Sequence, residues 1–332
     1  MKYTDDSKDF DVAISTRVRI ARNLKDYKFP HMLDKTNANK VIELIEKATD
    51  KKKYSFLRTE NIDKTNLYSL VEKHLISLDF VNLDGTAIIE NKDESLISMV
   101  NEEDHLRMQA FTSGFNVEEC YKKVKAFEEE MADKLEFAKS DKYGYLTSCP
   151  TNVGTAMRVS VLLHLQGLAE LGRLEDILEQ VRDIGLSVRG LYGENTSGFG
   201  NMYQISNQKT LGISDEEIIN KVRLVVSSII EQERMARKLL MKRKKIDFED
   251  KIYRAYGTLK YARKLEQDEV FKLLAYLRFG VSMGYFDDVK LSKIQNLLDA
   301  TQSNTLKTIL KENFDKKEED IKVADYIRKE LM

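Results

Sequence analysis

This chain is organised around the stretch Ser148-Cys149-Pro150-Thr151-Asn152-Val153-Gly154-Thr155-Ala156-Met157-Arg158. It follows a short apolar run at residues 143–146 and opens into the apolar residues 159–165, which predicts a strand, a turn and then a helix. A cysteine at the start of a helix lies beside unpaired N–H groups and the positive end of the helix dipole, and both favour a thiolate. Cys149 is therefore a candidate thiolate, although a lone cysteine is more often a small buried hydrophobe. Arg158, inside the predicted helix, could direct its guanidinium at a phosphate or remain an exposed surface residue.

Three other segments favour a chemical role for this stretch. They are Ser15-Thr16-Arg17-Val18-Arg19, Asn101-Glu102-Glu103-Asp104-His105-Leu106-Arg107 and Arg189-Gly190-Leu191-Tyr192-Gly193-Glu194. Apolar and polar residues alternate along residues 11–21, which predicts a strand with Arg17 and Arg19 on the same side. Two such arginines would form a rigid fork for polyphosphate oxygens; the alternative is a charged strand edge that discourages aggregation.

Composition excludes several classes of function. The chain has 332 residues, of which 42% are hydrophobic, and a formal net charge of -1. It is long enough for a large and a smaller domain, and it lacks the basic excess of proteins that bind nucleic acid or anionic membranes. Two cysteines, no leader and no apolar run of about 18 residues predict a soluble, cytoplasmic protein of a reducing compartment. With no C-x-x-C pair and four histidines, no metal site built from protein side chains is expected.

The order of the predicted elements indicates an α+β fold, with a mainly antiparallel sheet flanked by helices and a small all-helical domain after it. Predicted strands cover residues 11–21, 85–89, 96–100, 143–146, 186–188 and 202–205, and predicted helices cover residues 37–48, 66–76, 117–135, 159–165, 174–181 and 214–240. Asn37 is a candidate helix cap, and Ser214 with Glu217 has capping-box spacing. After the basic run at residues 242–245 every segment has helical periodicity, so the expected domains are residues 1–245 and 246–332.

Clustered arginines, two carboxylates and a thiolate suit a reaction between a polyphosphate and a cationic acceptor. In phosphoryl transfer the protein supplies mainly positioning and positive charge, helped by Mg²⁺. No G-x-x-x-x-G-K-[ST] loop occurs in the chain, so side chains, chiefly arginine, must hold any nucleotide. A guanidinium keeps its proton up to pH ~12.5 and is a poor nucleophile until that proton is removed. Two glutamates and a thiolate could accept that proton and hold the guanidino group in place.

The four motifs resemble those of the guanidino (phosphagen) kinases, and they are most similar to the bacterial protein-arginine kinases of the McsB type, over about residues 11–230. The resemblance implies ATP and Mg²⁺ as cofactors and the side chains of arginines in proteins as the acceptor. Glu103 matches the principal catalytic glutamate, Glu194 the second one, and Cys149 the thiol that positions the guanidinium. The implied ATP-binding residues are Ser15, Thr16, Arg17, Val18, Arg19, His74, Arg107, Arg158, Val159, Ser160, Val161, Leu162, Arg189, Gly190, Leu191, Tyr192 and Gly193. Taken alone, His74 would be read as a packed or surface histidine, and residues 195–200 as a mobile loop that could close over a ligand.

Two departures from the family pattern bear on function. Small-molecule phosphagen kinases carry a helical domain before the Ser-x-Arg-x-Arg strand, whereas fourteen residues precede Ser15 here, which favours an acceptor on a protein surface. The family's C-terminal Arg-Asp-x-x-Arg-Ala motif, which binds phosphoarginine, aligns with Glu319-Asp320-Ile321-Lys322-Val323-Ala324. Both arginines are replaced, so this allosteric site is expected to be absent or much weakened.

Two other functions stay open at this stage. One is a kinase for free arginine or another small guanidine. The other is a catalytically silent adaptor that binds nucleotide or arginine-rich partners, although a silent copy has no chemical need for Glu103, Glu194 and Cys149 together. The resemblance further implies a homodimer and, as partners, an activator protein, a Clp ATPase and a stress-response repressor.

Overall fold

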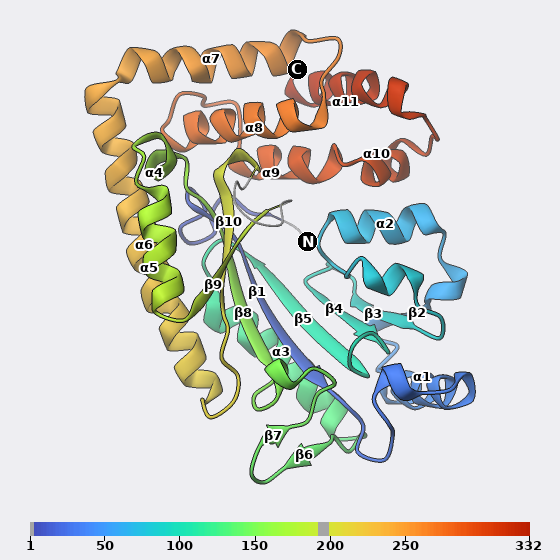
Figure 1. The fold of residues 1–332 in the computed structure, drawn as a ribbon. Coiled ribbons are helices and arrows are strands. Elements are labelled where there is room, and N and C mark those ends of the chain that lie inside the picture. Colours follow the sequence, from blue (N-terminus) through green and yellow to red (C-terminus); the bar gives the residue numbers. More distant parts are fainter. Residues whose placement is uncertain (1–2, 192–198) are drawn as a thin grey trace.

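The computed structural model describes residues 3–191 and 199–332, and its centre is a twisted eight-stranded sheet (Figure 1). The strands lie in the order β2-β3-β4-β5-β1-β8-β10-β9, and each neighbouring pair is antiparallel. Their bounds are β1 Ala13–Arg22, β2 Tyr54–Arg58, β3 Ala87–Asn91, β4 Leu96–Val100, β5 Leu106–Ser113, β8 Met157–His164, β9 Leu186–Gly190 and β10 Met202–Asn207. A separate hairpin consists of β6 Lys139–Ser140 and β7 Gly144–Tyr145. The mainly antiparallel α+β fold predicted from the sequence is confirmed.

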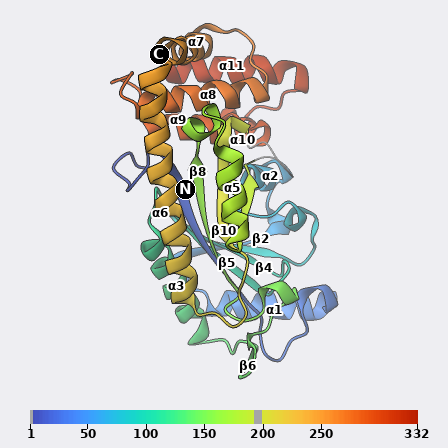
Figure 2. The same cartoon turned by 60° about the vertical axis from the view of Figure 1, so that its left-hand side comes forward.

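Strand β1 lies between β5 and β8 and organises the sheet. Its apolar side chains Val18 and Ile20 are fully buried on one face, as the alternation predicted. On that face they join one large apolar cluster with Val124 and Phe127 of α3 (Val117–Ala132) and with Val222 of α6 (Asp215–Arg243). Figure 2 shows α3 and α6 together on this side of the strands.

The remaining helices flank the sheet or follow it. In the part before residue 200 they are α1 Lys35–Ala48, α2 Lys64–Glu72, α4 Gln166–Glu170 and α5 Leu174–Asp183. The last part of the chain forms α7 Lys245–Tyr261, α8 Gln267–Ser282, α9 Leu291–Ala300, α10 Ser303–Leu310 and α11 Lys316–Leu331, and residues 245–332 contain no strand, as predicted. None of the helices in the described ranges is long and apolar enough to cross a membrane.

The prediction of a helix after Cys149 is wrong. Residues 157–164 form strand β8: Met157, Val159, Val161 and Leu163 recur at a period of two and are buried on one face, and the strand pairs with both β1 and β10. Strands β2 and β5 were not predicted. Helix α2 ends at Glu72, earlier than predicted, and the cap of α1 is the side chain of Asp34, which accepts from the Asn37 amide, and not Asn37 itself.

The helical region α7–α11 packs across one end of the sheet, at the top of Figure 1. Ile14 and Met202 of the sheet share an apolar cluster with Leu274 of α8 and Leu298 of α9. A carboxylate also joins the two parts: Glu72, at the end of α2, accepts hydrogen bonds from the amides and side chains of Asn304 and Thr305 in the first turn of α10, at 2.7–2.9 Å. A negative charge at a helix N-terminus is favourable, so this contact fixes α10 against α2.

A buried ion pair in α6 links several segments. Glu233 and Arg237 are 2.7 Å apart and their side chains are almost fully buried. Glu233 also accepts from the amides of Gly167 and Leu168 at the start of α4. Arg237 donates to the carbonyls of Asp11 and His164 and to the Ser282 hydroxyl of α8. The pair therefore ties the sheet to the helical region.

Replacing Glu233 with alanine should destabilise the protein by about 3–5 kcal/mol, because Arg237 would remain buried and unpaired. Chemical denaturation followed by circular dichroism measures this loss. Asp250→Ala, which removes the exposed partner of Arg254 in α7, is the matched control and should leave the unfolding midpoint nearly unchanged. Equal stabilities of the two variants would contradict the assignment of Glu233 as a structural anchor.

Candidate active site

Five arginines lie on the face of the sheet opposite the apolar cluster, and we call this set the arginine face: Arg17, Arg19, Arg107, Arg158 and Arg189. The register of the sheet places them together, because directly opposed residues of neighbouring strands share a face. Arg19 of β1 is opposite Arg158 of β8, and Ala21 of β1 is opposite Arg107 of β5. Gln204 of β10 is opposite both Leu162 of β8 and Arg189 of β9, which extends the same face to the sheet edge.

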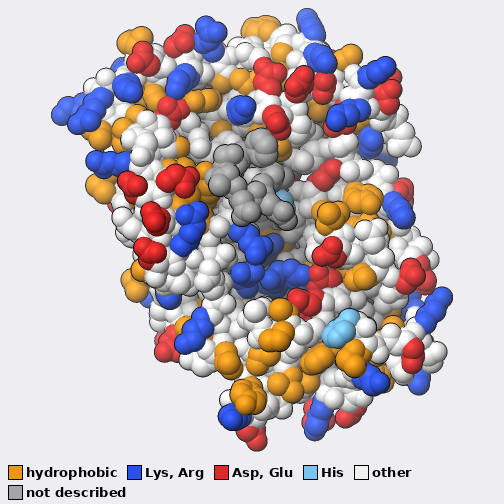
Figure 3. All heavy atoms as spheres, viewed as in Figure 1, with side chains coloured by type: hydrophobic (Ala, Val, Ile, Leu, Met, Phe, Trp, Pro, Cys, Tyr) orange, Lys and Arg blue, Asp and Glu red, His pale blue; other side chains and the backbone are white. Residues whose placement is uncertain are grey.

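The positive charges of the arginine face repel one another. Burial and then the neighbouring charges of Arg107 and Arg158 lower the pKa of Arg17 to about 10. The pKa values of Arg19 and Arg158 are also lowered, first by burial and then by neighbouring arginines. Figure 3 shows Lys and Arg side chains gathered in a central hollow of the molecule. Such a site stabilises a polyvalent anion, because the anion offsets both the repulsion and the lost hydration.

A cavity of about 450 Å³ lies beside the arginine face. On the sheet side it is lined by Ser15, Arg17, Ser160, Leu162 and Arg189, and the Arg17 guanidinium donates to the side chain of Gln204 at 3.1 Å. The opposite wall is formed by residues of α9, α10 and α11. This volume lies within the usual range of small-molecule sites, about 300–1,000 Å³.

Two smaller hollows continue the cavity along the arginine face. Arg189 lines both the cavity and a second hollow, which it shares with Arg158 and Asn152. Arg158 in turn lines a third, small hollow together with Arg19, Arg107 and Glu103. The arginine face thus forms a continuous track that begins at the cavity and ends at Glu103.

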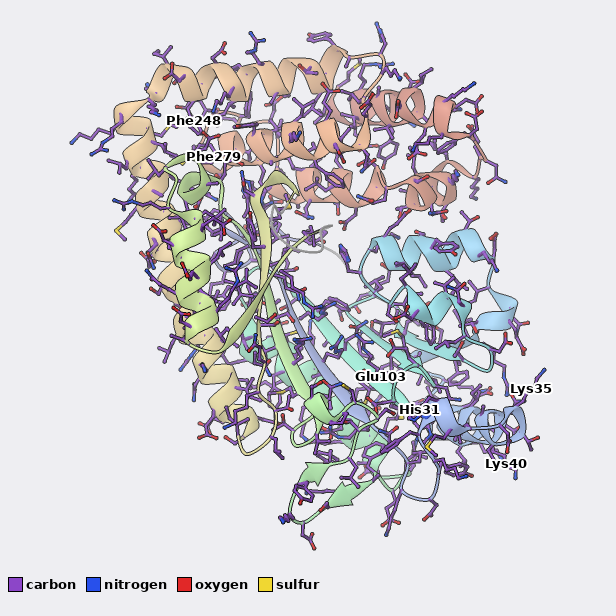
Figure 4. All side chains as sticks on the ribbon, in the orientation of Figure 1. His31, Lys35, Lys40, Glu103, Phe248 and Phe279 are labelled. Carbon is purple, nitrogen blue, oxygen red and sulfur yellow. The ribbon has the colours of Figure 1, made fainter. Side chains whose placement is uncertain are left out.

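Glu103 lies between β4 and β5, at the end of the central strands remote from Phe248 and Phe279 of the helical region (Figure 4). Burial first, and then the nearby charges of Asp104 and Glu102, raise the pKa of its carboxyl group, although the side chain reaches solvent. The residues around Cys149 contact this loop: Ser148 donates to the Glu103 carbonyl oxygen at 2.5 Å, and Asn152 donates to its carboxylate at 3.4 Å. The Glu103 loop and the Cys149 loop therefore form one site.

The environment of Cys149 differs from the prediction. A single 3-10 turn, Pro150–Asn152, follows it in place of a helix, so the expected support from a helix dipole is missing. The thiol is half-buried and lies 3.0 Å from the hydroxyl of Thr151. Any activation of the thiol must come from its neighbours and its ligand.

Glu102 is a site residue that the sequence interpretation missed. Burial opposes its ionisation, but Arg107, Ser77 and the Glu103 amide together lower its pKa. Its carboxylate accepts from the Arg107 guanidinium at 2.5 Å, from the Ser77 hydroxyl at 2.6 Å and from the Glu103 amide at 3.0 Å. Glu102 thereby fixes Arg107 beside Glu103. Its adjacency to Glu103 was the only available signal, and adjacency does not distinguish the two carboxylates.

Asp104 and His105 form the support of the Glu103 loop. Both are buried: Asp104 accepts from the Asn23 side chain at 2.6 Å and from the Ser148 amide at 2.8 Å, and His105 accepts from the Leu24 amide at 3.0 Å. Burial lowers the pKa of His105 to about 4, so its imidazole is neutral near pH 7. These contacts hold the loop against the end of β1.

The other residues predicted to bind a nucleotide fall into three groups. His74 lines the cavity and has a left-handed φ of 57°. Gly190 and Leu191 also line the cavity. In contrast, the side chains of Thr16, Val18, Val159 and Val161 are buried on the apolar face, away from the cavity. Tyr192, Gly193, Glu194 and most of the predicted mobile loop 195–200 lie outside the described residues.

A metal ion would have few protein ligands at this site. Within residues 3–191 and 199–332 no group of three His, Cys, Asp or Glu side chains could hold one. Mg²⁺ commonly keeps several waters and is bound largely through substrate phosphates, so the site fits an ion that arrives bound to a nucleotide.

Replacing Glu102 with glutamine should lower the pKa of Glu103, because the change removes a nearby negative charge and releases Arg107 toward the Glu103 carboxylate. A ¹³C NMR titration of the glutamate side chains, with Glu103 assigned from a Glu103→Gln sample, measures this shift. Glu118→Gln, at the distant contact with Arg223, is the control and should leave the titration unchanged. An equal or higher pKa of Glu103 in the Glu102 variant would refute its proposed environment.

Comparison with known proteins gives the family. The family model of the ATP:guanido phosphotransferase C-terminal catalytic domain matches residues 36–236, and that of the protein-arginine kinase McsB C-terminal domain matches residues 245–332. The protein-arginine kinase of Clostridium acetobutylicum is 41% identical over 332 residues, which cover 98% of each chain. That of Clostridium tetani is 38% identical and covers 97% of this chain and 95% of its own.

Solved structures support the same fold. The crystal structure of lombricine kinase matches with a TM-score of 0.61 and 24% identity, over 70% of this chain and 69% of that chain. The duplicated taurocyamine kinase from Schistosoma mansoni, with bound transition state analog components, matches with a TM-score of 0.58 and 27% identity, over 70% of this chain and 34% of that chain. With an arginine track that ends at a carboxylate and relatives of this kind over its full length, the chain belongs to the protein-arginine kinase family of ATP:guanido phosphotransferases.

Proposed function

We propose that this protein transfers the γ-phosphoryl group of MgATP to the guanidino group of arginine side chains in proteins. The observation that carries the proposal is the track of five arginines that leads from the cavity to Glu103. It supports a nucleotide in the cavity, its phosphates along the arginines and its reactive end at the carboxylate.

The arginines supply the positive charge that the reaction requires. Phosphoryl transfer spreads negative charge over the transferred group, and fixed cations stabilise that charge without reorganising. Three cations lie with Glu103 in the third hollow: Arg19, Arg158 and Arg107, which Glu102 holds. Mg²⁺ would come with the nucleotide and would neutralise phosphate charge.

Glu103, Cys149 and Glu194 are the residues that would bind and deprotonate the acceptor guanidinium. The raised pKa of Glu103 makes its carboxylate a better acceptor for the proton of a guanidinium. A second carboxylate from Glu194 and the Cys149 sulfur would hold the other guanidino nitrogens. The nitrogen lone pair then attacks the γ-phosphorus, the bond between the γ-phosphorus and the bridging oxygen breaks, and ADP leaves.

The acceptor is proposed to be an arginine on a protein, as the names of the relatives indicate. Glu103 reaches solvent at the end of the track, which suits an arginine presented on a surface. The rival, a kinase for free arginine, predicts that the free amino acid is the better acceptor.

We also propose a division into domains at residues 245 and 246, cytoplasmic action, dimerisation and the family's regulatory partners, all by analogy with the family.

Incubation with ATP should phosphorylate arginines of a folded protein substrate, and mass spectrometry at neutral pH, which preserves acid-labile N–P bonds, detects the product. Glu103→Gln should lower the rate at least about 100-fold while ATP binding remains near normal, because it removes the general base. Glu136→Gln, in an exposed pair with Lys25, is the matched control. The proposal fails if only free arginine is labelled or if the Glu103 variant turns over at the wild-type rate.

The segment aligned with the family's phosphoarginine-binding motif should not bind phosphoarginine. Asp320 pairs with Lys264 at 3.2 Å, Glu319 accepts from Ser303 at 3.1 Å, and Val323 is buried, so the segment presents carboxylates where an anion would need arginines. Calorimetry of the full chain with a phosphoarginine peptide should therefore detect no site beyond the active site. A stoichiometry of two peptides per chain would contradict this expectation.

A further inference from the structure

The cavity in which the proposed function puts the nucleotide has one wall that is made by the helical region. The side chains of this wall include Asn296 and Asp299 of α9, Ile309 of α10 and Tyr326 of α11. Every residue to which the proposed function gives a task lies before residue 200. The proposed function therefore leaves the helical wall of the cavity without a role.

Ile309 presents apolar surface inside the cavity. The residue is 44% exposed, whereas Leu306, one turn earlier in α10, is fully buried in the apolar cluster of the helical region. A single exposed apolar side chain is ordinary on a protein surface, but Ile309 lines a cavity that Leu162 and Leu191 line from the sheet side. A ligand with an apolar face would cover Ile309 in this cavity and remove its surface from water, which is favourable.

The two walls of the cavity differ in charge. The sheet side contributes Arg17 and Arg189. The described residues of the helical region that line the cavity include no lysine or arginine and one carboxylate, that of Asp299. A phosphate group would be attracted to the sheet side and repelled by Asp299. The helical wall therefore suits an uncharged and partly apolar group.

The arginine track determines which part of a nucleotide meets this wall. Transfer takes place at Glu103, so the γ-phosphoryl group lies at that end of the track, and the base and ribose lie in the cavity. Figure 4 shows Glu103 at the end of the strands remote from Phe248 and Phe279 of the helical region. The uncharged end of the nucleotide thus meets the wall that suits an uncharged group.

A contact between α2 and α10 holds Ile309 in position relative to the sheet side. Glu72, at the end of α2, accepts from the amide and the hydroxyl of Thr305 at 2.7 and 2.8 Å. His74, two residues after Glu72, lines the cavity, and so does Ile309, one turn after Thr305 on α10. The contact therefore joins the two walls, and the wall that carries Ile309 is in place before a nucleotide binds, which lowers the cost of binding.

We propose that the helical region is part of the nucleotide-binding site, and that Ile309 of α10 and Tyr326 of α11 pack against the base and ribose of the bound nucleotide. The inference rests on the proposed function, because it assumes a nucleotide in the cavity. ATP is then held by two parts of the chain, its phosphates by the sheet and its nucleoside by the helical region. Nucleotide affinity therefore depends on the docking of α9–α11 against the sheet, and nucleotide binding in turn stabilises that docking.

Equilibrium binding of two ligands to the full chain tests this, by calorimetry in the presence of Mg²⁺ and without protein substrate. The probes are ATP and inorganic tripolyphosphate, which carries three phosphates but no base or ribose. Wild-type protein should bind ATP at least roughly tenfold more tightly, because the apolar contacts of the nucleoside add to those of the phosphates. Equal affinities for the two ligands would overturn the proposal even if no variant folded.

The variant Ile309→Ala removes the apolar surface and keeps a residue that favours α10. It should weaken ATP binding roughly tenfold and leave tripolyphosphate binding unchanged. Ile321→Ala is the matched control, because Ile321 is 48% exposed on α11 but does not line the cavity, and it should keep the wild-type ratio of affinities. An equal loss for both ligands in the Ile309 variant would indicate a disturbed arginine face, and an unchanged ATP affinity would show that the nucleoside does not reach this wall; either result refutes the proposal.

The two proposals fail in different ways. If arginines are phosphorylated but the Ile309 variant binds ATP as the wild type does, the inference about the helical wall is wrong and the proposed function stands. If the variant loses affinity for ATP alone but no arginine is labelled by the wild type, the proposed function is wrong and the nucleoside site stands. Absence of ATP binding to the wild type would refute both.

Discussion

The convergence of five guanidinium groups on one face of a sheet is the constraint on which this structure depends. Burial and mutual repulsion lower the pKa values of Arg17, Arg19 and Arg158, so the arrangement is unfavourable until an anion occupies it. The antiparallel pairing of β1 with β5 and β8 holds these side chains in register, and the apolar cluster on the opposite face supplies the stability that offsets their repulsion. The folded sheet therefore contains a preformed binding site for an anion.

Three carboxylates hold this arrangement together at its margins; Glu102 and Glu233 are buried, and Glu72 is half-buried. Glu102 fixes Arg107 beside Glu103, Glu233 with Arg237 joins α6 to the sheet, and Glu72 binds the first turn of α10. Each accepts hydrogen bonds from several donors at once, which compensates the carboxylate for lost hydration. Because Glu72 and Glu233 both connect the sheet to the helical region, the cavity between these two parts has fixed walls.

Different parts of the site suit different parts of the two substrates, in order from the cavity to Glu103. The cavity suits a base and sugar, the arginines suit phosphates, and the loops that carry Glu103 and Cys149 suit the acceptor. This separation lets the acceptor end stay open to solvent while the base end is enclosed between the sheet and α9–α11. A large acceptor can then approach without disturbing the nucleotide, which is the arrangement that phosphorylation of a protein side chain requires.

The sequence by itself determined the features that depend on local pattern. Alternation in β1 predicted the shared side of Arg17 and Arg19, the capping box predicted the start of α6, and helical periodicity predicted the last five helices. The motifs identified the family and the two loops that meet at the site. The run after Cys149 was misread as a helix, because its period of two is short and becomes decisive only when β1 and β10 pair with it.

Only the tertiary structure decided which distant residues act together. Glu102 and Glu72 carry no sequence signal of their roles, because each role depends on partners that belong to other elements. Hydrogen-bond partners and strand register are set by the packing of segments far apart in the chain, and a local pattern contains no record of that packing.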